Sequence, residues 1–304
     1  MVMRKPGTFH PARSFGIGTV LNYLFLALLG FMTFFPLYNI LMVSLTGPAK
    51  IAAANGLSVI PHDFSFATYI TLVQIPKVAK GLFNSLYITA AGVLINMVLT
   101  CLAAYALSRP KLPGKPFFMV FILITMIFEG GLIPDFLLMK NLHLLNNYYS
   151  VILYKAVNAY YLIIMIRFFE EVPLSLIEAG KMDGVTEMRT LVSIVLPVSK
   201  AGVATVSLFY AVFHWNEYFR AMIYLTNPDK WPLQVVLREL IVSGDKAAFI
   251  GALNYLKYEV GAAQVDMKAL KAGVIILAVL PILFLYPVLL RYFSKGTLSG
   301  AVKE

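Results

Sequence analysis

Residues 178–197 read EAGKMDGVTEMRTLVSIVLP, a short charged segment with one glycine and an apolar exit. Apolar stretches long enough to cross a bilayer lie on both sides of it. A charged segment between two such stretches has to leave the hydrocarbon layer, because charged side chains at membrane depth are costly. We therefore expect the segment to present Lys181, Asp183 and Glu187 to a soluble partner.

The local pattern predicts two short helices within 175–190. Ser175 and Glu178 have the S-x-x-E spacing of a capping box, preceded by Pro173, which suits a helix start. Gly184 suits the left-handed conformation that ends a helix. We expect the first helix to run to Gly184 and the second to begin at Thr186.

The composition is that of a membrane protein. Hydrophobic residues make up 60% of the 304 residues and charged residues 13%, with a mean hydropathy of +0.79. Soluble domains are seldom so apolar. A helix needs about 20 mostly apolar residues to span a hydrocarbon core of about 30 Å. Six segments meet this test, namely 17–45, 82–107, 117–139, 148–169, 198–225 and 270–292.

The distribution of Lys and Arg predicts the orientation of these spans. Short connections rich in basic residues face the cytoplasm. With six spans, the basic residues of the N-terminus, the second connection and the tail fall on one side: Arg4, Lys5, Arg13, Arg109, Lys111, Lys115, Arg291, Lys295 and Lys303. We therefore predict that both termini are cytoplasmic. The net charge of +10 reflects this topology and does not indicate nucleic-acid binding.

These spans divide the chain into consecutive parts. We expect a cytoplasmic segment over 1–16, a first span over 17–45, an external loop over 46–81, a five-helix core over 82–293 and a cytoplasmic tail over 294–304. The core contains the segment 175–190 and a second external loop over 226–268.

Motifs of covalent catalysis are absent from the sequence. It has no phosphate-binding loop, no H-E-x-x-H and no G-x-S-x-G. The four histidines have no metal-ligand spacing, and the single cysteine, Cys101, lies in the second span. We expect no enzyme activity and no metal site, so uphill transport would need an ion gradient or an ATPase partner.

The 178–197 segment resembles a known signature. The permease subunits of bacterial ATP-binding-cassette importers carry E-A-A, three residues, G, nine residues and I-x-L-P, which this chain matches at Glu178, Ala179, Gly184, Ile194, Leu196 and Pro197. Gly180 replaces the second alanine. The stretches 130–151, 215–225 and 295–303 are similar to the carbohydrate branch of that family, close to the smaller maltose-importer permease.

The resemblance implies an all-α type I importer permease in the bacterial cytoplasmic (inner) membrane. Its partners would be a second, homologous permease, an ATPase dimer that binds ATP and Mg, and an extracytoplasmic solute-binding protein. The chain itself would hold no cofactor. The coupling residues would be Glu178, Ala179, Gly180, Asp183, Gly184, Ile194, Leu196 and Pro197. Glu178 can alternatively serve only to cap its own helix.

Candidate pore residues lie in the third and fifth spans. Intramembrane polar groups usually face water or one another. Glu129, beside Gly130 and Gly131 at a point where the helix can break, either faces the pore or packs on the partner permease.

The fifth span holds the other candidates, Trp215, Asn216, Glu217 and Tyr218. Glu217 and Arg220 are spaced as a self-neutralising pair. Trp215 and Tyr218 either stack on sugar or belong to an interfacial aromatic belt.

The second external loop contains an amphipathic helical pattern. Apolar residues recur at helical spacing at Leu233, Val236, Leu237, Leu240 and Ile241, with Arg238 among them. Such a helix either lies in the membrane interface or contacts the binding protein. By the resemblance, we expect the contact with the binding protein at Leu233, Val236, Leu237, Arg238 and Leu240.

Two functions are consistent with these features. An ATPase-driven carbohydrate importer is favoured over an ion-coupled secondary transporter, because intramembrane carboxylates are few and no inverted repeat is evident. The connection over 130–147 is most similar to permeases for acidic oligo- or polysaccharides such as alginate or pectin fragments, with neutral oligosaccharides as the second choice. Lys77, Lys80, Lys140 and Arg220 on the external side would suit an acidic substrate.

Overall fold

A computed structural model describes residues 17–47, 60, 63–243 and 266–300, with side chains to residue 287. Over these residues the fold is helical, apart from a single bridge between Thr46 and Phe64. The predicted segments 1–16 and 301–304 lie outside the described residues. So does most of the loop between Gly47 and Asp63 and the part of the second external loop from 244 to 265.

Three of the predicted spans are long, continuous apolar helices. They are α1 (Ile17–Ser44), α4 (Pro76–Ser108) and α17 (Met267–Gly300). Each has the length and hydropathy needed to cross a membrane, α17 over Met267–Pro287. α4 begins six residues before the predicted span, because Pro76 occupies the first position of the helix, where its missing N–H costs nothing.

The other three predicted spans are each divided into two helices. The break in the third span lies where Glu129, Gly130 and Gly131 indicated that the helix can break, whereas the breaks in the fourth and fifth spans correct the expectation of continuous helices. The third consists of α5 (Lys115–Ile127) and α6 (Leu132–Asn141), bent by 110°. The fourth consists of α7 (Tyr148–Ile152) and α8 (Ala159–Glu170), and the fifth of α12 (Lys200–Asn216) and α13 (Phe219–Tyr224). Left-handed residues explain two breaks, with Gly131 at φ +86° and Lys155 at φ +50°.

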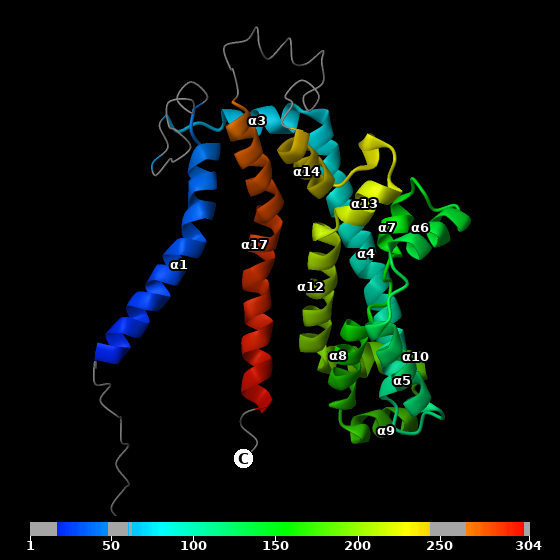
Figure 1. The fold of residues 1–304 in the computed structure, drawn as a ribbon. Helices are drawn as coiled ribbons and strands as arrows, with labels where there is room; N and C mark the ends of the chain where they lie inside the picture. The colour runs from blue at the N-terminus through cyan, green and yellow to red at the C-terminus, as the bar shows by residue number, and fades with distance from the viewer. Residues whose placement is uncertain (1–16, 48–59, 61–62, 244–265, 301–304) are drawn as a thin grey trace, which may run out of the picture.

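Figure 1 shows how the chain passes between the two ends of the molecule. The first residues of α1 and the last of α17 lie at the end that carries α9 (Leu174–Met182). Two other helices, α3 (Ala67–Gln74) and α14 (Leu233–Ser243), lie at the opposite end. α1 leans away from the other helices toward its first residue (Figure 1).

Helix α4 is the centre of the fold and packs on α8, α12 and α14. Its buried contacts with α12 are polar: Asn96 lies 3.0 Å from His214 Nε2, and the Thr100 and Tyr210 hydroxyls lie 2.7 Å apart. Gly92 lies against the His214 ring so closely that a Cβ would overlap it. Small and hydrogen-bonding residues of this kind hold membrane helices together where burial alone gives little.

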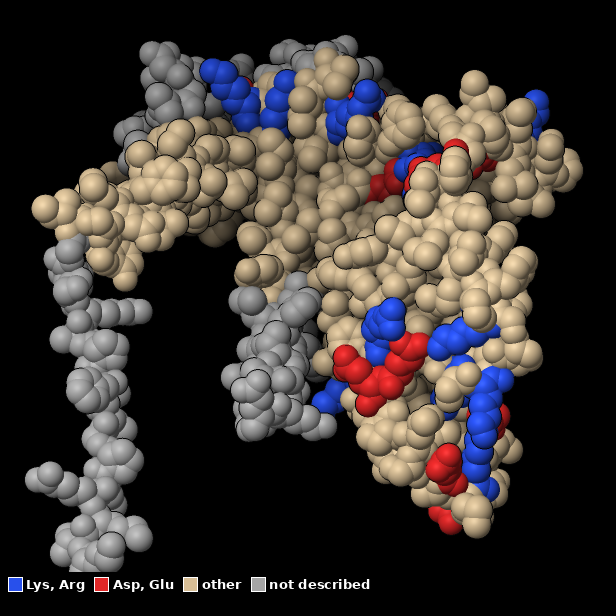
Figure 2. Space-filling model, turned by 60° about the horizontal axis from the view of Figure 1, so that its bottom comes forward, with Lys and Arg blue, Asp and Glu red and all other residues tan. Residues whose placement is uncertain are grey.

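Charged side chains are segregated on the face shown in Figure 2. They gather at the end that carries α9 and at the opposite end, with a broad uncharged surface between them. This band suits a hydrocarbon layer flanked by two polar regions. A small group of charged side chains interrupts the band at a hollow.

Candidate functional site

The charged segment folds into the two predicted short helices. α9 begins at Leu174 directly after Pro173 and ends at Met182, and Gly184 follows at φ +72°. No side chain caps its start, so the predicted capping box is wrong: Ser175 already lies inside the first turn. The second helix, α10 (Glu187–Thr190), begins one residue after the predicted start, and Thr186 caps it: its hydroxyl accepts from the Arg189 N–H at 3.4 Å.

One face of α9 is exposed and the other packs on the segment that leads to α12. Glu178, Ala179 and Asp183 are exposed, whereas Ile177 and Gly180 are buried. A Cβ at Gly180 would lie 2.9 Å from Ile194 Cδ1. The glycine that departs from the E-A-A pattern therefore has a packing role, because it lets α9 lie against Ile194.

Ile194, Leu196 and Pro197 form the exit from this segment. Leu191–Val195 is a π-helical turn and is followed by the short α11 (Leu196–Val198). Ile194 and Leu196 are half-buried and Pro197 is exposed. The chain then bends by 89° into α12. The exit is therefore a corner that fixes the direction of α12 relative to α9.

A charged network ties the segment to the end of α4. Glu187 accepts a hydrogen bond from the Tyr105 hydroxyl at 2.5 Å and pairs with Lys181 at 2.7 Å. The Arg109 guanidinium lies 3.9 Å from the centre of the Tyr105 ring. The Lys181 and Tyr105 hydrogen bonds hold the pKa of the Glu187 carboxyl below its usual range, so it is ionised at neutral pH.

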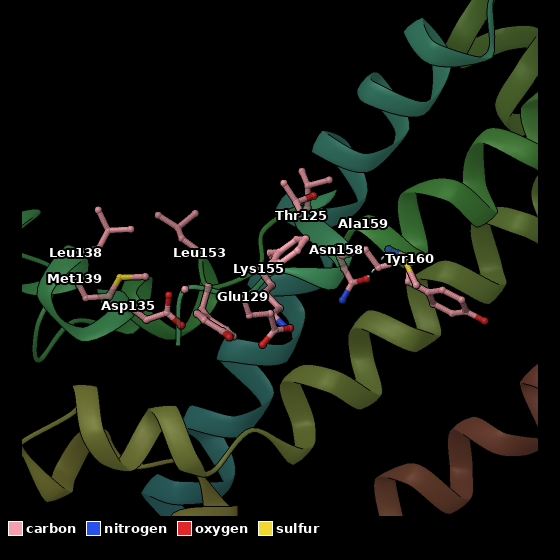
Figure 3. A pocket seen from close by; sticks show the side chains of 15 residues that line it. Thr125, Glu129, Asp135, Leu138, Met139, Leu153, Lys155, Asn158, Ala159 and Tyr160 are labelled. Atoms are coloured by element: carbon pink, nitrogen blue, oxygen red, sulfur yellow. Dashed lines mark hydrogen bonds and ion pairs between the residues drawn. The ribbon is translucent and has the colours of Figure 1, made fainter. Parts of the chain in front are cut away.

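A second candidate site is a cavity of about 490 Å³ at the breaks of the third and fourth spans. Such a volume is typical of small-ligand sites. Figure 3 shows residues from both spans around it. The polar part of its lining consists of Thr125, Glu129, Asp135, Tyr154, Lys155, Asn158 and Tyr160.

Glu129 lies in this cavity, in the linker between α5 and α6. The Lys155 ammonium donates a 2.6 Å hydrogen bond to its carboxylate, and the two side chains lie beside one another in Figure 3. Their exposed fractions are 59% for Glu129 and 34% for Lys155. Sequence reasoning missed Lys155; the available signal was a lysine inside a predicted span, a placement that usually marks a functional site.

A second ion pair lies next to Tyr154 of the cavity lining and joins Arg220 of α13 to Glu217, the C-cap residue of α12. The Arg220 guanidinium lies 3.8 Å from the centre of the Tyr154 ring and donates to Glu217 at 3.1 Å. The self-neutralising pair predicted from the i, i+3 spacing is therefore present. Glu217 is nearly buried, with 8% of its side chain exposed, and does not line the cavity.

The remaining pore candidates of the fifth span point in different directions. Trp215 is buried against α17, and its indole N–H donates to the Ala278 carbonyl at 2.8 Å. This position fits neither of the two alternatives considered for Trp215, sugar stacking or an interfacial aromatic belt, because its ring fills the core between two helices. Asn216 and Tyr218 are exposed, and Arg238 lies 5.7 Å from the Tyr218 ring.

The external amphipathic helix exists as α14, but its apolar face points inward. Leu233, Val236 and Leu240 are fully buried against α4 and α17, and Leu237 is half-buried. This corrects the expectation that Leu233, Val236 and Leu240 contact a partner directly. Of the predicted contact residues, Arg238 is exposed.

Comparison with known proteins agrees with these features. Residues 114–299 match the family described as "Binding-protein-dependent transport system inner membrane component". The "Polygalacturonan/rhamnogalacturonan transport system permease protein YtcP" of Bacillus subtilis (strain 168) is 35% identical over 93% of this chain and 97% of its own. "Protein LplC" of the same organism is also 35% identical, over 99% of this chain and 100% of its own.

A solved structure extends this likeness to three dimensions. Its title is "Crystal structure of a bacterial ABC transporter involved in the import of the acidic polysaccharide alginate". A chain in it superposes with a TM-score of 0.82 at 30% identity, covering 95% of this chain and 100% of that one.

Proposed function

The chain belongs to the family of binding-protein-dependent transport system inner membrane components, and from this we propose that it is the permease subunit of an ATP-driven carbohydrate importer. It forms half of a translocation pathway with a second, homologous permease. ATP and Mg are bound by a partner ATPase dimer, so this chain catalyses no reaction. The observation that carries the proposal is the match over residues 114–299, which includes the charged segment and both broken spans of the cavity.

We assign six passes across the bacterial inner membrane, with both termini cytoplasmic. α1, α4 and α17 are single spans, and the pair α5–α6 has the length and hydropathy of a broken span. We assign the fourth pass to α7 and α8 and the fifth to α12 and α13. The course of the chain supports this topology, since the ends of α1 and α17 lie on the same side as α9 (Figure 1).

The segment 175–190 transmits motion from the ATPase. α9 carries the exposed face that docks, and Gly180 against Ile194 fastens α9 to the corner before α12. Glu187 links the same segment to Tyr105 on α4. Because α4 packs on α8, α12 and α14, a displacement of α9 reaches most of the core as a rigid-body shift.

The sugar pathway passes the cavity at Glu129. Non-helical backbone at membrane depth is tolerated where it lines a water-filled cavity, so the helix breaks beside this cavity suit a position on the transport pathway. Carboxylates such as Glu129 and Asp135 accept hydrogen bonds from sugar hydroxyls, and Tyr154 and Tyr160 supply aromatic surface. Asn216 and Tyr218 remain candidates for the outer part of the pathway.

We assign an acidic oligo- or polysaccharide as the substrate, with a neutral oligosaccharide as the alternative. Two similar proteins support this choice through their names, one for polygalacturonan and rhamnogalacturonan and one for alginate. An extracytoplasmic binding protein delivers the sugar, with the exposed face of α14 at Arg238 as its contact.

An affinity-tagged chain, purified in mild detergent from its own membrane, tests the assignment. We expect a second permease and an ATPase to co-purify, with ATPase activity that rises when the binding protein and a uronate oligomer are added. A single chain without ATPase activity would instead favour the ion-coupled transporter. Glu129 and Glu217 would then be the candidate ion sites, although each is paired with a basic residue.

A further inference from the structure

The cavity between the broken third and fourth spans contains a basic side chain that neither the sequence pattern nor the comparisons assign. Among the residues that line it, Lys155 is the one cation, and Glu129 and Asp135 are the carboxylates. A lysine at membrane depth is costly unless it pairs or binds a ligand. Lys155 is therefore a candidate ligand-binding group.

The backbone holds Lys155 firmly in place. Its φ of +50° is uncommon for a residue with a Cβ, and such conformations persist where the surroundings determine them. The preceding residue, Tyr154, is buried, and its ring is covered by Arg220. The following helix, α8, is capped by Asn158, whose N–H donates to the Tyr210 hydroxyl of α12 at 3.0 Å. Lys155 is thus fixed from both sides.

Glu129, the partner of Lys155, is much less constrained. It lies in the short linker between α5 and α6, followed by Gly130 and Gly131, and more than half of its side chain is exposed. Exposed ion pairs are weak, because water competes for both charges. The Glu129 carboxylate can therefore separate from Lys155 at small cost, whereas the backbone of Lys155 stays in place.

Arg220, the other cation near the cavity, is not available to a ligand. Arg220 is held by the nearly buried Glu217 and by the Tyr154 ring. Asp135 faces the cavity from α6, on the far side of Glu129 from Asn158 in Figure 3. The cavity lining has one positive charge, on Lys155, and two negative charges, on Glu129 and Asp135. A substrate carboxylate can therefore pair with Lys155 only in place of Glu129.

We propose that Lys155 is a substrate-carboxylate site of the pathway, and that a uronate carboxylate replaces Glu129 on it as the sugar passes. The Glu129–Lys155 pair would then be the resting state of a site specific for acidic sugars. This inference rests on the proposed function, because it assumes that the cavity is the sugar pathway.

The test uses the complete complex, with its partner permease, ATPase and binding protein, reconstituted in proteoliposomes. Two probes share one backbone: an oligogalacturonate and its methyl-esterified, uncharged form. Lys155→Gln should lower uptake of the acid about tenfold or more, as expected for loss of a charge-assisted contact, and leave uptake of the ester close to wild type. Lys155→Arg should restore part of the acid uptake.

Two further variants separate binding from structural support. Glu129→Gln removes the competing carboxylate and should lower the ratio of the KM for the acid to the KM for the ester severalfold. Lys268→Gln, at an exposed position in the first turn of α17 and outside the cavity lining, removes the same charge and should change neither probe.

The outcomes distinguish the inference from the function on which it rests. Equal losses of acid and ester uptake in Lys155→Gln, with reduced complex yield, would show a purely structural ion pair and overturn the inference. So would unchanged acid uptake in that variant. If the wild-type complex takes up the ester but not the acid, the acidic substrate is wrong. If it takes up neither in the presence of ATP, the proposed function itself fails.

Discussion

The Tyr105 hydroxyl and the Glu187 carboxylate are joined by a 2.5 Å hydrogen bond, which fastens the last turn of α4 to the segment beside α9. Lys181 neutralises the same carboxylate from α9. One carboxylate therefore connects α9, α10 and α4. If α9 is the docking helix, this is the point at which its motion reaches the central helix of the fold.

Removing that hydrogen bond should loosen coupling without preventing assembly. For Tyr105→Phe we expect the complex to form normally but to hydrolyse several times more ATP per sugar transported. A single hydrogen bond to a charged group is worth about 1.5–3 kcal/mol, enough for such a shift. Parallel assays of ATPase activity and uptake in proteoliposomes measure the ratio.

Tyr87→Phe is the matched control for this prediction. Tyr87 lies in the first half of the same helix, meets the Tyr148 ring edge to face and is 40% exposed. Its hydroxyl can be removed with no effect on the ratio. An unchanged ratio in Tyr105→Phe as well would mean that α9 transmits its motion by another contact.

Gly184 tests the docking surface itself. Its φ of +72° disfavours residues with a Cβ, and a Cβ there would meet no atom of this chain within 4 Å. Gly184→Asn should be tolerated, since Asn adopts the left-handed conformation. Gly184→Glu should abolish uptake by blocking the ATPase interface, while membrane insertion continues. Wild-type uptake by Gly184→Glu would exclude docking at this turn; immunoblots of membrane fractions check insertion.

The parts of the fold that follow from local chemistry could be predicted from the sequence. The two short helices of the 178–197 segment were predictable from its charged residues, from Thr186 at the start of α10 and from Gly184 at the end of α9. Helix caps and left-handed turns depend on neighbouring residues, so a local pattern is enough to indicate them. Hydropathy also located α1, α4 and α17, since a long apolar run has few alternatives in a bilayer.

Hydropathy alone could not locate the breaks in the other spans. Gly130 and Gly131 beside Glu129 indicated the break in the third span, but the apolar residues on both sides of Lys155 concealed where the helices of the fourth span end. The cavity depends on contacts between the third and fourth spans, which no local pattern encodes. Likewise, the helical spacing of Leu233, Val236 and Leu240 predicted α14 but not which elements its apolar face would meet.

Gly92 should be intolerant of any side chain. A Cβ at this position would overlap the His214 ring, which is itself fixed by Asn96. Overpacking of this kind typically costs about 1–3 kcal/mol, so Gly92→Ala should lower the thermal stability of the purified permease pair. Gly30→Ala on α1 is the control, because a Cβ there meets nothing within 4 Å. Equal melting curves for the two variants would contradict the tight packing of α4 on α12.

Substitution of Trp215 distinguishes a role in core packing from a role in sugar binding. Trp215→Phe keeps an aromatic ring but loses the N–H that donates to the Ala278 carbonyl, leaving that buried carbonyl without this donor. We expect a loss of stability of about 1–3 kcal/mol and an unchanged KM for transport. Tyr218→Leu, at an exposed aromatic of the same span, should leave stability nearly unchanged. Thermal unfolding and uptake kinetics of both variants distinguish the two roles. A raised KM with unchanged stability in Trp215→Phe would show that Trp215 binds sugar.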